Sequence, residues 1–384
     1  EVFDMICKAD TIGLFQIESR AQMNTLPRLQ PRQFYDLVVE VALIRPGPIQ
    51  GEMVHPYLRR RRGEEPITYL HPSLEPHLAR TLGIPLFQEQ GMKIAIEIGG
   101  FSPSEADELR RAMAHKRSRK AMDELGAKLI DRMGARGFEQ GIAERIVKQL
   151  TAFADYGFPE SHAASFALLV WASAYLKLHY TPEFYAAILN SQPMGFYSAS
   201  TLVEDAKRHH VVVRGPCVMA SEWDCTLEPI SPLSWVPDQR SREQNKSRVQ
   251  SSTIGESAES PDSRRRTLER GAPGPREIQP FALRIGLRYV RGLGERTKAS
   301  VVRSLAPRSL HEFVRRAGLD EAQLLALAHA GAFDALEPER RRAIWEVMRL
   351  AKAPAGPLDL PGIERDPPRL PAQSESDLVA ADFQ

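Results

Sequence analysis

The sequence predicts a mainly α-helical protein in which a disordered insertion separates two folded domains. Apolar residues recur at spacings of three and four through most of residues 1–228, which is typical of amphipathic helices. Residues 229–281 are rich in Ser, Arg, Glu, Gln and Pro, with little that could form a core. Helical spacing resumes over residues 282–352, and a proline-rich, unstructured tail is expected at 353–384.

The composition is that of an ordinary globular protein. Of 384 residues, 42% are hydrophobic and 26% charged. The net charge is only +2, so nucleic-acid binding would depend on local basic patches. The three cysteines are too few and scattered for a disulfide framework or a zinc site, and no secretory signal is present, so we expect a reduced, cytoplasmic protein. The longest apolar run, 163–176, favours a buried core helix over a membrane span.

Two basic features lie in the first quarter of the chain. Apolar spacing predicts a helix over 32–43, which ends before Arg45-Pro46-Gly47-Pro48. Each proline of this turn holds the residue before it out of the α region, so Arg45 is presented on a stiff loop. The basic run that includes Arg60 follows at 59–62. Charge alone leaves two alternatives for this run, a solvated surface segment or a contact with a phosphate backbone.

The clearest helix start in the sequence lies just after Phe101. Ser102 is the expected N-cap, Pro103 occupies the first helical position, and Glu105 completes a capping box. The apolar spacing of this helix ends near His115. Further helices are predicted over 121–136 and from about Ile142, in each case from apolar residues in register.

Two adjacent arginines lie near the end of that first helix. Arg110 and Arg111 point about 100° apart on a helix, so a polyanion lying alongside could meet both. A basic junction that includes Lys116 follows them directly. Arginine forks suit phosphate oxygens, which makes the pair a candidate polyphosphate site. From spacing alone, ion pairs with nearby acids on the helix surface remain the commoner alternative.

A histidine opens the strongly apolar helix that we expect from Ser161. His162 follows the rigid turn Tyr156-Gly157-Phe158-Pro159. The first turn of a helix exposes unpaired amide groups and a positive dipole potential, so His162 is placed to meet a phosphate or a sugar. A capping or core histidine is the commoner alternative.

Residues 290–299 have the form of a helix-hairpin-helix. Gly292 and Gly294 let the backbone turn tightly between two helices, and the amides of the turn can meet a DNA phosphate. Arg296 and Lys298 add positive charge. An ordinary glycine turn is the alternative, and a degenerate second copy is expected around 328–333.

Five stretches of the chain resemble the fingers region of bacterial C-family DNA polymerases, the α subunit of DNA polymerase III. They are Gly13-Leu14-Phe15-Gln16-Ile17-Glu18-Ser19, Arg45-Pro46-Gly47-Pro48, Phe87-Gln88-Glu89-Gln90, Leu109-Arg110-Arg111-Ala112-Met113 and the stretch from Tyr156 to His162. The resemblance covers residues 1–228 and resumes over 282–350. Residues 54–61 and 221–225 resemble the error-prone, damage-inducible paralogue more than the replicative enzyme.

The resemblance implies a fingers domain at 1–228 that binds the incoming deoxynucleoside triphosphate, and a helix-hairpin-helix domain at 282–352 that grips duplex DNA. The paired arginines would contact the phosphates, and the histidine would lie at the nucleotide pocket. The predicted nucleotide-binding residues are Arg110, Arg111, His162 and Lys116, and the predicted DNA-binding residues are Gly292, Gly294, Arg296, Lys298, Arg45 and Arg60.

The resemblance also implies a DNA-directed DNA polymerase that copies damaged DNA, with template-primer DNA and deoxynucleoside triphosphates as partners. Its catalytic aspartates and their Mg²⁺ would lie in a palm domain upstream of Glu1, because no Asp-x-Asp pair in an apolar strand occurs here. We therefore expect a piece of a longer polypeptide, truncated before its next domain and inactive alone. The sliding clamp and other mutasome proteins are further candidate partners, although no glutamine-led clamp motif precedes Gln384. The alternative is a non-catalytic DNA-binding scaffold that has lost nucleotide handling.

Overall fold

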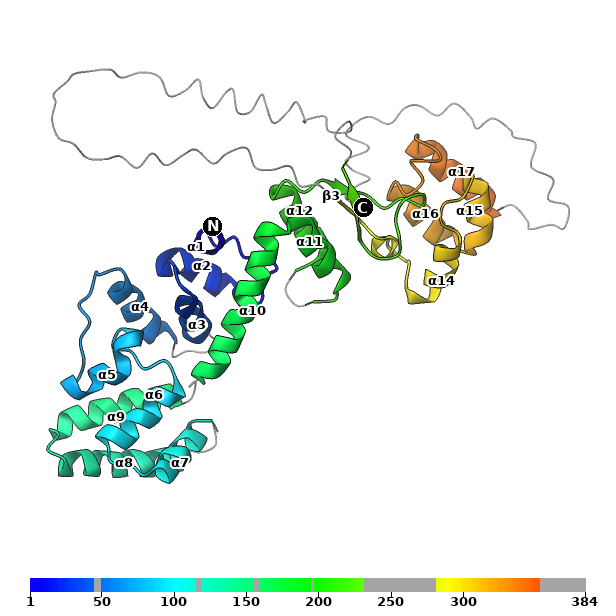
Figure 1. Ribbon diagram of the computed structural model, residues 1–384. Helices are drawn as coiled ribbons and strands as arrows, with labels where there is room; N and C mark the ends of the chain where they lie inside the picture. The colour runs from blue at the N-terminus through cyan, green and yellow to red at the C-terminus, as the bar shows by residue number, and fades with distance from the viewer. Residues whose placement is uncertain (45–49, 115–118, 155–158, 195–196, 231–280, 353–384) are drawn as a thin grey trace, which may run out of the picture. The chain divides into compact units, whose positions relative to one another are not determined.

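The computed structural model describes residues 1–44, 50–114, 119–154, 159–194, 197–230 and 281–352 (Figure 1). They are mainly helical, as predicted, with one small sheet among them. The chain divides into two compact units, Glu1–Tyr180 (unit 1) and Thr181–Gln384 (unit 2). The helices after Tyr180 thus group with the hairpin region, whereas the sequence-based domain limit lies at residue 228.

Unit 1 consists of helices and short helical turns. These are α1 (Val2–Cys7), α2 (Arg20–Leu29), α3 (Phe34–Leu43), α4 (Gln50–Arg61), η1 (Pro72–Leu74), α5 (Glu75–Leu78), η2 (Ala79–Thr81), α6 (Gln88–Lys93), the π-helical turn η3 (Ile94–Ile98), α7 (Pro103–Ala114), α8 (Arg119–Ala135), α9 (Gln140–Ala154) and α10 (Glu160–His179). The helices predicted over 32–43 and 121–136 and from Ile142 are α3, α8 and α9.

Helix α10 packs along α3 through small residues. Its buried face includes Ala163, Ala167 and Ala174, which lack the bulk to hold the two helices apart, and α3 is buried from Asp36 to Leu43. The opposite face is exposed, with Leu168 at 59% and Leu169 at 50% of their maximal exposure. The prediction of a buried core helix is therefore wrong for half of α10. No helix in the described part of the chain is long and apolar enough to span a membrane.

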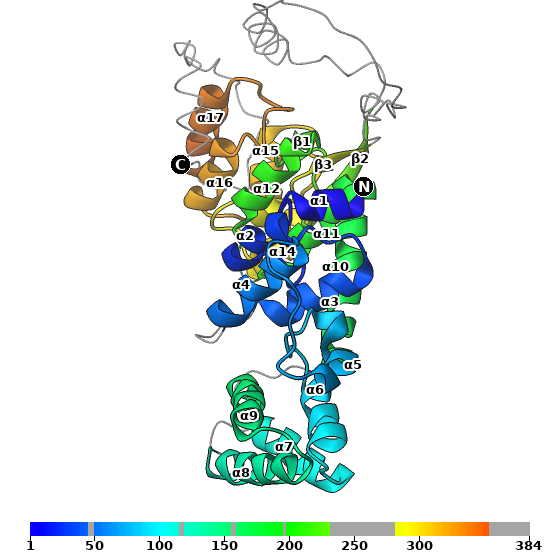
Figure 2. The ribbon, with the colours of Figure 1, turned by 90° about the vertical axis from the view of Figure 1, so that its left-hand side faces the viewer.

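Helices α7, α8 and α9 gather at one end of unit 1 (Figures 1 and 2). Leu109 of α7, Leu129 of α8 and Ile146 of α9 are buried in a shared core. The predicted capping box of α7 is present: the Ser102 amide donates to Glu105 Oε2 at 2.8 Å, and the Glu105 amide donates to Ser102 Oγ at 3.3 Å.

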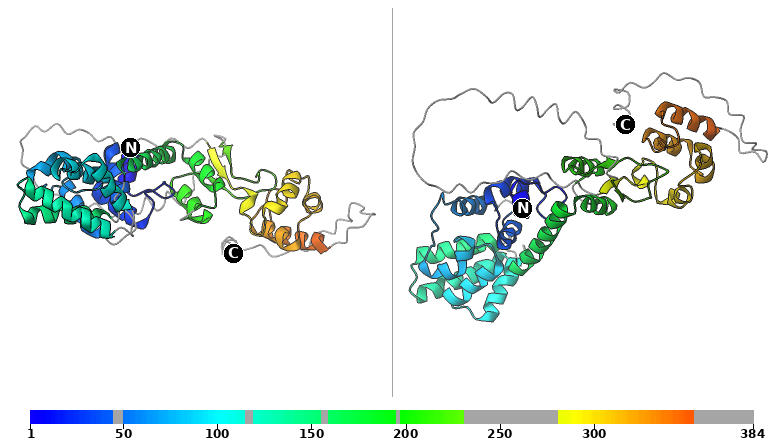
Figure 3. Two further views of the ribbon diagram at one scale, coloured as in Figure 1. Left: turned by 90° about the horizontal axis from the view of Figure 1, so that it is seen from below. Right: turned by 45° about the horizontal axis from the view of Figure 1, so that its top comes forward.

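Unit 2 combines helices with the sheet. Its elements are α11 (Thr181–Asn190), α12 (Ala199–Arg208), β1 (Val213–Arg214), β2 (Thr226–Pro229), β3 (Phe281–Arg284), η5 (Leu287–Tyr289), α14 (Glu295–Arg303), α15 (Leu310–Ala317), α16 (Glu321–His329) and α17 (Arg340–Lys352). Helices α15, α16 and α17 lie within residues 282–352, where helical spacing was predicted to resume. Helices α14 to α17, yellow to orange in Figure 3, enclose a core that includes Val301, Phe313 and Leu327.

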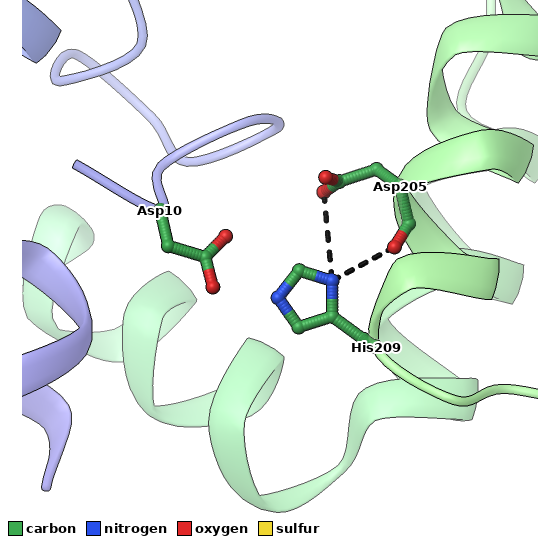
Figure 4. Close-up of side chains that lie close together, drawn as sticks. All are labelled: Asp10, Asp205 and His209. Carbon is green, nitrogen blue, oxygen red and sulfur yellow. Dashed lines mark hydrogen bonds and ion pairs between the residues drawn. The ribbon is translucent and has the colours of Figure 1, made fainter. Parts of the chain in front are cut away.

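A hydrogen-bonded group joins α11 to α12. The Tyr185 hydroxyl donates to Asp205 Oδ2 at 2.6 Å. His209 Nδ1 lies 2.8 Å from the backbone oxygen of Asp205 and 4.0 Å from its Oδ2 (Figure 4). Tyr185 and Asp205 are buried, so the bond between them satisfies polar groups that would otherwise be costly to bury.

The sheet has the order β1-β3-β2, with β1 parallel and β2 antiparallel to β3. Strand β3 pairs Phe281 with Pro229, so the two ends of the predicted insertion are neighbours in the sheet. Residues 231–280 lie outside the described residues, as does the predicted tail at 353–384. Pro229 and Phe281, the first and last residues of the predicted insertion, are thus strand residues.

The predicted helix-hairpin-helix differs from expectation in its first half. Gly292 and Gly294 are followed by α14, as expected, but the segment before them is only the 3₁₀ turn η5. Tyr289 ties this turn to α11, because its hydroxyl donates to the Leu189 backbone oxygen at 2.5 Å. Val290 and Leu293 are buried on either side of the turn.

Candidate nucleotide and DNA contact sites

The two arginines of α7 converge on one carboxylate. Arg110 donates to Asp107 Oδ1 through Nε at 2.9 Å, and its Nη2 lies 2.8 Å from the same oxygen. Arg111 Nη2 lies 2.8 Å from Asp107 Oδ2. The surface ion pair that sequence reasoning kept as the alternative is thus present. The same geometry also shows that the two guanidinium groups can reach a single anion.

Electrostatics and packing both define this site. The hydrogen bond from Arg110, aided by the charge of Arg111, holds the pKa of the Asp107 carboxyl below its usual value. The side chain of Arg110 is 42% exposed and that of Arg111 is 73% exposed, so both are open to a ligand. The helix beneath them is fixed at its start, where Arg132 Nη1 and Nη2 donate to the two oxygens of Glu105 at 2.8 and 2.7 Å.

His162 lies in the first turn of α10, as predicted, and it is exposed. Its ring centroid is 4.2 Å from that of Phe166, and Phe166 meets Phe15 edge-on at 5.2 Å. Phe15 is 39% exposed. The start of α10 therefore presents a group of three rings, of which Phe15 and Phe166 were not predicted from the sequence.

The start of α10 is held by residues that sequence reasoning did not select. The Glu160 amide donates to Glu89 Oε2 at 2.9 Å, so the carboxylate of Glu89 caps the positive end of the helix. The Tyr35 hydroxyl donates to Glu160 Oε1 at 3.0 Å, and Arg80 lies 4.1 Å above the Tyr35 ring. Burial and the neighbouring Glu160 raise the pKa of Tyr35. Together these contacts anchor the first turn of α10, which carries His162.

The 87–90 stretch is organised by a buried glutamine next to that cap. Gln90 Oε1 accepts from the amides of Leu86 and Phe87 at 2.9 and 3.1 Å, and Gln90 Nε2 donates to Thr81 Oγ1 at 2.8 Å. Because Gln90 fixes the turn that leads into α6, it sets the position of Glu89 one residue earlier. The 87–90 stretch and the start of α10 are therefore joined through the contact between Glu89 and Glu160.

Arg60 has structural partners that sequence reasoning could not foresee. Its Nη1 donates to the Leu82 backbone oxygen at 2.8 Å, its Nη2 to Thr68 Oγ1 at 3.2 Å, and its Nε to Glu65 Oε1 at 3.2 Å. Only 11% of its side chain is exposed. These contacts do not support a DNA contact by Arg60. The other arginines of the run are also paired with acids, Arg59 with Glu65, Arg61 with Asp36 and Arg62 with Glu64.

Two predicted site residues cannot be placed. Lys116, assigned to the nucleotide site, and Arg45, assigned to DNA, lie outside the described residues. The contributions of both residues stay predictions.

The glycine turn of unit 2 lies directly before α14. Gly292 has a φ of 84°, in the left-handed region that favours glycine. Gly294 is the N-cap of α14, and its amide donates to Thr297 Oγ1 at 3.2 Å. Gln323 of α16 donates to the Gly292 backbone oxygen at 3.1 Å and so ties the turn to the rest of the unit. The positive end of α14 is consequently presented at an exposed turn.

The charges around this turn are not all equally available. Lys298 Nζ lies 3.0 Å from Glu295 Oε1, so its charge is partly compensated. The exposed side chain of Arg296, which was predicted, has no ion pair or hydrogen bond within the part of the chain that the structure describes. The same holds for Arg291, which sequence reasoning missed although it precedes Gly292 directly. Arg291 and Arg296 therefore differ from Lys298, whose charge is partly compensated.

Comparisons with known proteins give a family match in each of the two units. Residues 1–137 match the family model of the bacterial DNA polymerase III alpha subunit finger domain, and residues 210–343 match a helix-hairpin-helix motif model. The chain is 49% identical to the error-prone DNA polymerase of Anaeromyxobacter sp. (strain K), in an alignment that covers 100% of this chain and 31% of that protein. It is 47% identical to error-prone DNA polymerase 1 of Agrobacterium fabrum, with 92% and 29% covered.

A third relative, the error-prone DNA polymerase of Bordetella bronchiseptica, is 45% identical over 99% of this chain and 32% of its own length. The chain thus spans about a third of the length of the curated relatives it matches. The finger-domain match, the helix-hairpin-helix match and these identities agree with the resemblance of the five stretches. On this basis the chain belongs to the bacterial DNA polymerase III α-subunit family.

Proposed function

We propose that this chain holds both substrates of an error-prone, DNA-directed DNA polymerase that copies damaged templates. In this proposal Arg110 and Arg111 bind the triphosphate of the incoming deoxynucleotide, with His162 beside it. The turn of Gly292 and Gly294 binds the backbone of template-primer DNA. The observation that carries the nucleotide part is the convergence of both guanidinium groups on one carboxylate, since phosphate oxygens accept from the same donors.

The role of the arginines is electrostatic. Nucleotidyl transfer moves negative charge onto the leaving pyrophosphate, and fixed cations lower the barrier if they are in place before the reaction. The Glu105–Arg132 bonds tie the start of α7 to α8, which limits the movement of the helix that carries the arginines. A divalent metal would activate the attacking hydroxyl. In this proposal the metal is bound by palm-domain residues outside this chain, as the family resemblance implies.

The nucleotide part predicts that Arg110→Ala/Arg111→Ala weakens binding of a deoxynucleoside triphosphate by about tenfold or more, because two charge-assisted contacts are lost. Titration of the 384-residue chain with dATP at low salt measures this effect. The matched control is Arg145→Ala/Lys148→Ala, which removes two exposed charges from α9 and should change affinity less than twofold. Equal affinities of the double variant and the unchanged chain would remove the arginines from the site.

The DNA part predicts a change in salt dependence. Loss of two phosphate contacts in Arg291→Ala/Arg296→Ala should make the slope of log K against log salt shallower by about 2. Fluorescence anisotropy with a labelled primer-template duplex at several salt concentrations gives the slope. The control Arg303→Ala/Arg308→Ala removes two exposed charges away from the turn and should leave the slope unchanged. A parallel drop in affinity for both variants, without a slope difference, would argue against phosphate contacts at the turn.

One observation favours the alternative of a DNA-binding scaffold without nucleotide handling. Both arginines of α7 already have an anionic partner in Asp107. The scaffold hypothesis predicts that the chain binds DNA and that no variant has measurable affinity for triphosphates. The dATP titration therefore distinguishes the two functions.

A further inference from the structure

Asp107 uses the donors of the α7 arginines that a phosphate would need. Arg110 points both Nε and Nη2, the edge that can grip an oxyanion with two parallel bonds, at Asp107 Oδ1. Arg111 contributes Nη2 to the other oxygen, Oδ2. A phosphate can therefore take the two-donor edge of Arg110 only if Asp107 leaves it.

Asp107 differs in this respect from the other acids of α7. Glu105 is engaged by Arg132 and Lys128, away from the arginine pair. Glu108 is exposed, and no ion pair or hydrogen bond of its side chain is present among the described residues. Asp107 alone joins Arg110 to Arg111, and with 34% of its side chain exposed it has room to turn toward water.

We propose that Asp107 is an internal competitor for the nucleotide, a resident anion that the triphosphate displaces from both guanidinium groups. This inference rests on the proposed nucleotide site. Exchange of one anion for another keeps the guanidinium groups paired throughout. Before the nucleotide binds, the carboxylate of Asp107 also lowers the net positive charge of the site. A ligand with one phosphate merely substitutes for the carboxylate. A triphosphate carries further charged oxygens, so polyphosphates are the ligand class that such a site favours.

The test is Asp107→Asn, which keeps the size of the side chain and removes its charge. We expect dATP to bind the full 384-residue chain about three- to tenfold more tightly, because the competing ion pairs are gone. Glu108→Gln is the matched control. It removes the same charge one residue further along the helix and should change affinity less than twofold. In the Arg110→Ala/Arg111→Ala background, Asp107→Asn should have no effect.

Each outcome decides the inference. Weaker binding by Asp107→Asn would make Asp107 a residue that positions the arginines, and unchanged binding would leave it a surface ion pair; both overturn competition. An equal gain in Glu108→Gln would reduce the effect to general charge and overturn it too. In these cases a loss of affinity in Arg110→Ala/Arg111→Ala still supports the nucleotide site. Absence of dATP binding in every variant would overturn the site and the inference together. Circular dichroism confirms that the variants keep their helix content.

Discussion

Replacement of Lys177 by alanine is expected to destabilise unit 1 by about 3–5 kcal/mol. The side chain of Lys177 is fully buried at the end of α10, where Nζ donates to Asp10 Oδ1 at 2.9 Å and to the Ile12 backbone oxygen at 3.1 Å. The alanine variant leaves a cavity and removes the donor of both hydrogen bonds. Lys177→Met refills most of the volume, so it should recover part of the loss and separate packing from charge.

The free energy of unfolding of unit 1 has to be measured separately, because the chain has two compact units and need not unfold in one step. Pulsed hydrogen exchange across a urea series, read on peptides from α3 and α10, reports the unfolding of unit 1. Lys148→Ala, an exposed change on α9 in the same unit, is the control and should stay within about 0.5 kcal/mol of the unchanged chain. A similarly small effect for Lys177→Ala would mean that the ion pair between Lys177 and Asp10 contributes little to the fold.

The second large effect concerns Glu40, which lies at the centre of α3 with no exposed surface. Neither of its carboxyl oxygens has a hydrogen-bond partner among the described residues. Burial raises its pKa to about 8, and the charge of Arg28 offsets this only in part. In the unfolded chain the group ionises near pH 4.5, so between pH 4.5 and 8 unfolding releases a proton. The stabilisation is thus complete below pH 4.5 and is lost as pH rises to about 8.

Comparison with Glu40→Gln isolates this effect, because the amide does not ionise. The free energy of unfolding of unit 1 should fall relative to the variant by about 1.4 kcal/mol per pH unit across this window. The total is several kcal/mol, so the variant should be clearly the more stable protein at pH 8.5. Glu108→Gln, which removes an exposed carboxylate, should leave the pH profile unchanged. Parallel pH profiles of the unchanged chain and Glu40→Gln would show that Glu40 is ionised in the fold.

The elements that were predicted well are those whose signals are local. The start of α7 needed only Ser102, Pro103 and Glu105, and the predicted capping box is present. The left-handed conformation of Gly292 likewise needs only the glycine and its immediate neighbours. Strand β3 was missed because its four residues carry little pattern of their own. They form a strand by pairing with β1 and with β2, the latter more than fifty residues earlier in sequence.

Among the site residues, too, those with a local sequence signal were recognised and those that depend on distant partners were not. Arg110 and Arg111 were recognised because adjacent arginines on a predicted helix are visible in sequence. The role of Glu89 could not be, since its partner is the amide of Glu160 on a different helix. The partners of Arg60 are also tertiary: Thr68 and the backbone of Leu82 accept from its guanidinium group, and no rule of local charge predicts that. Tertiary contacts decided which cations remain available.

The pairing of Pro229 with Phe281 has a consequence for how the chain can vary. The chain leaves the sheet at the end of β2 and returns to it at the start of β3, and these two ends are paired. The segment between them therefore connects two points whose separation is fixed regardless of the segment's length. The entropic cost of such a loop grows only with the logarithm of its length, by about 0.6 kcal/mol per doubling. This position can therefore lengthen or shorten during evolution while unit 2 keeps its core. For the same reason it is a natural point at which to graft a reporter domain or a purification handle without disturbing α7 or the hairpin.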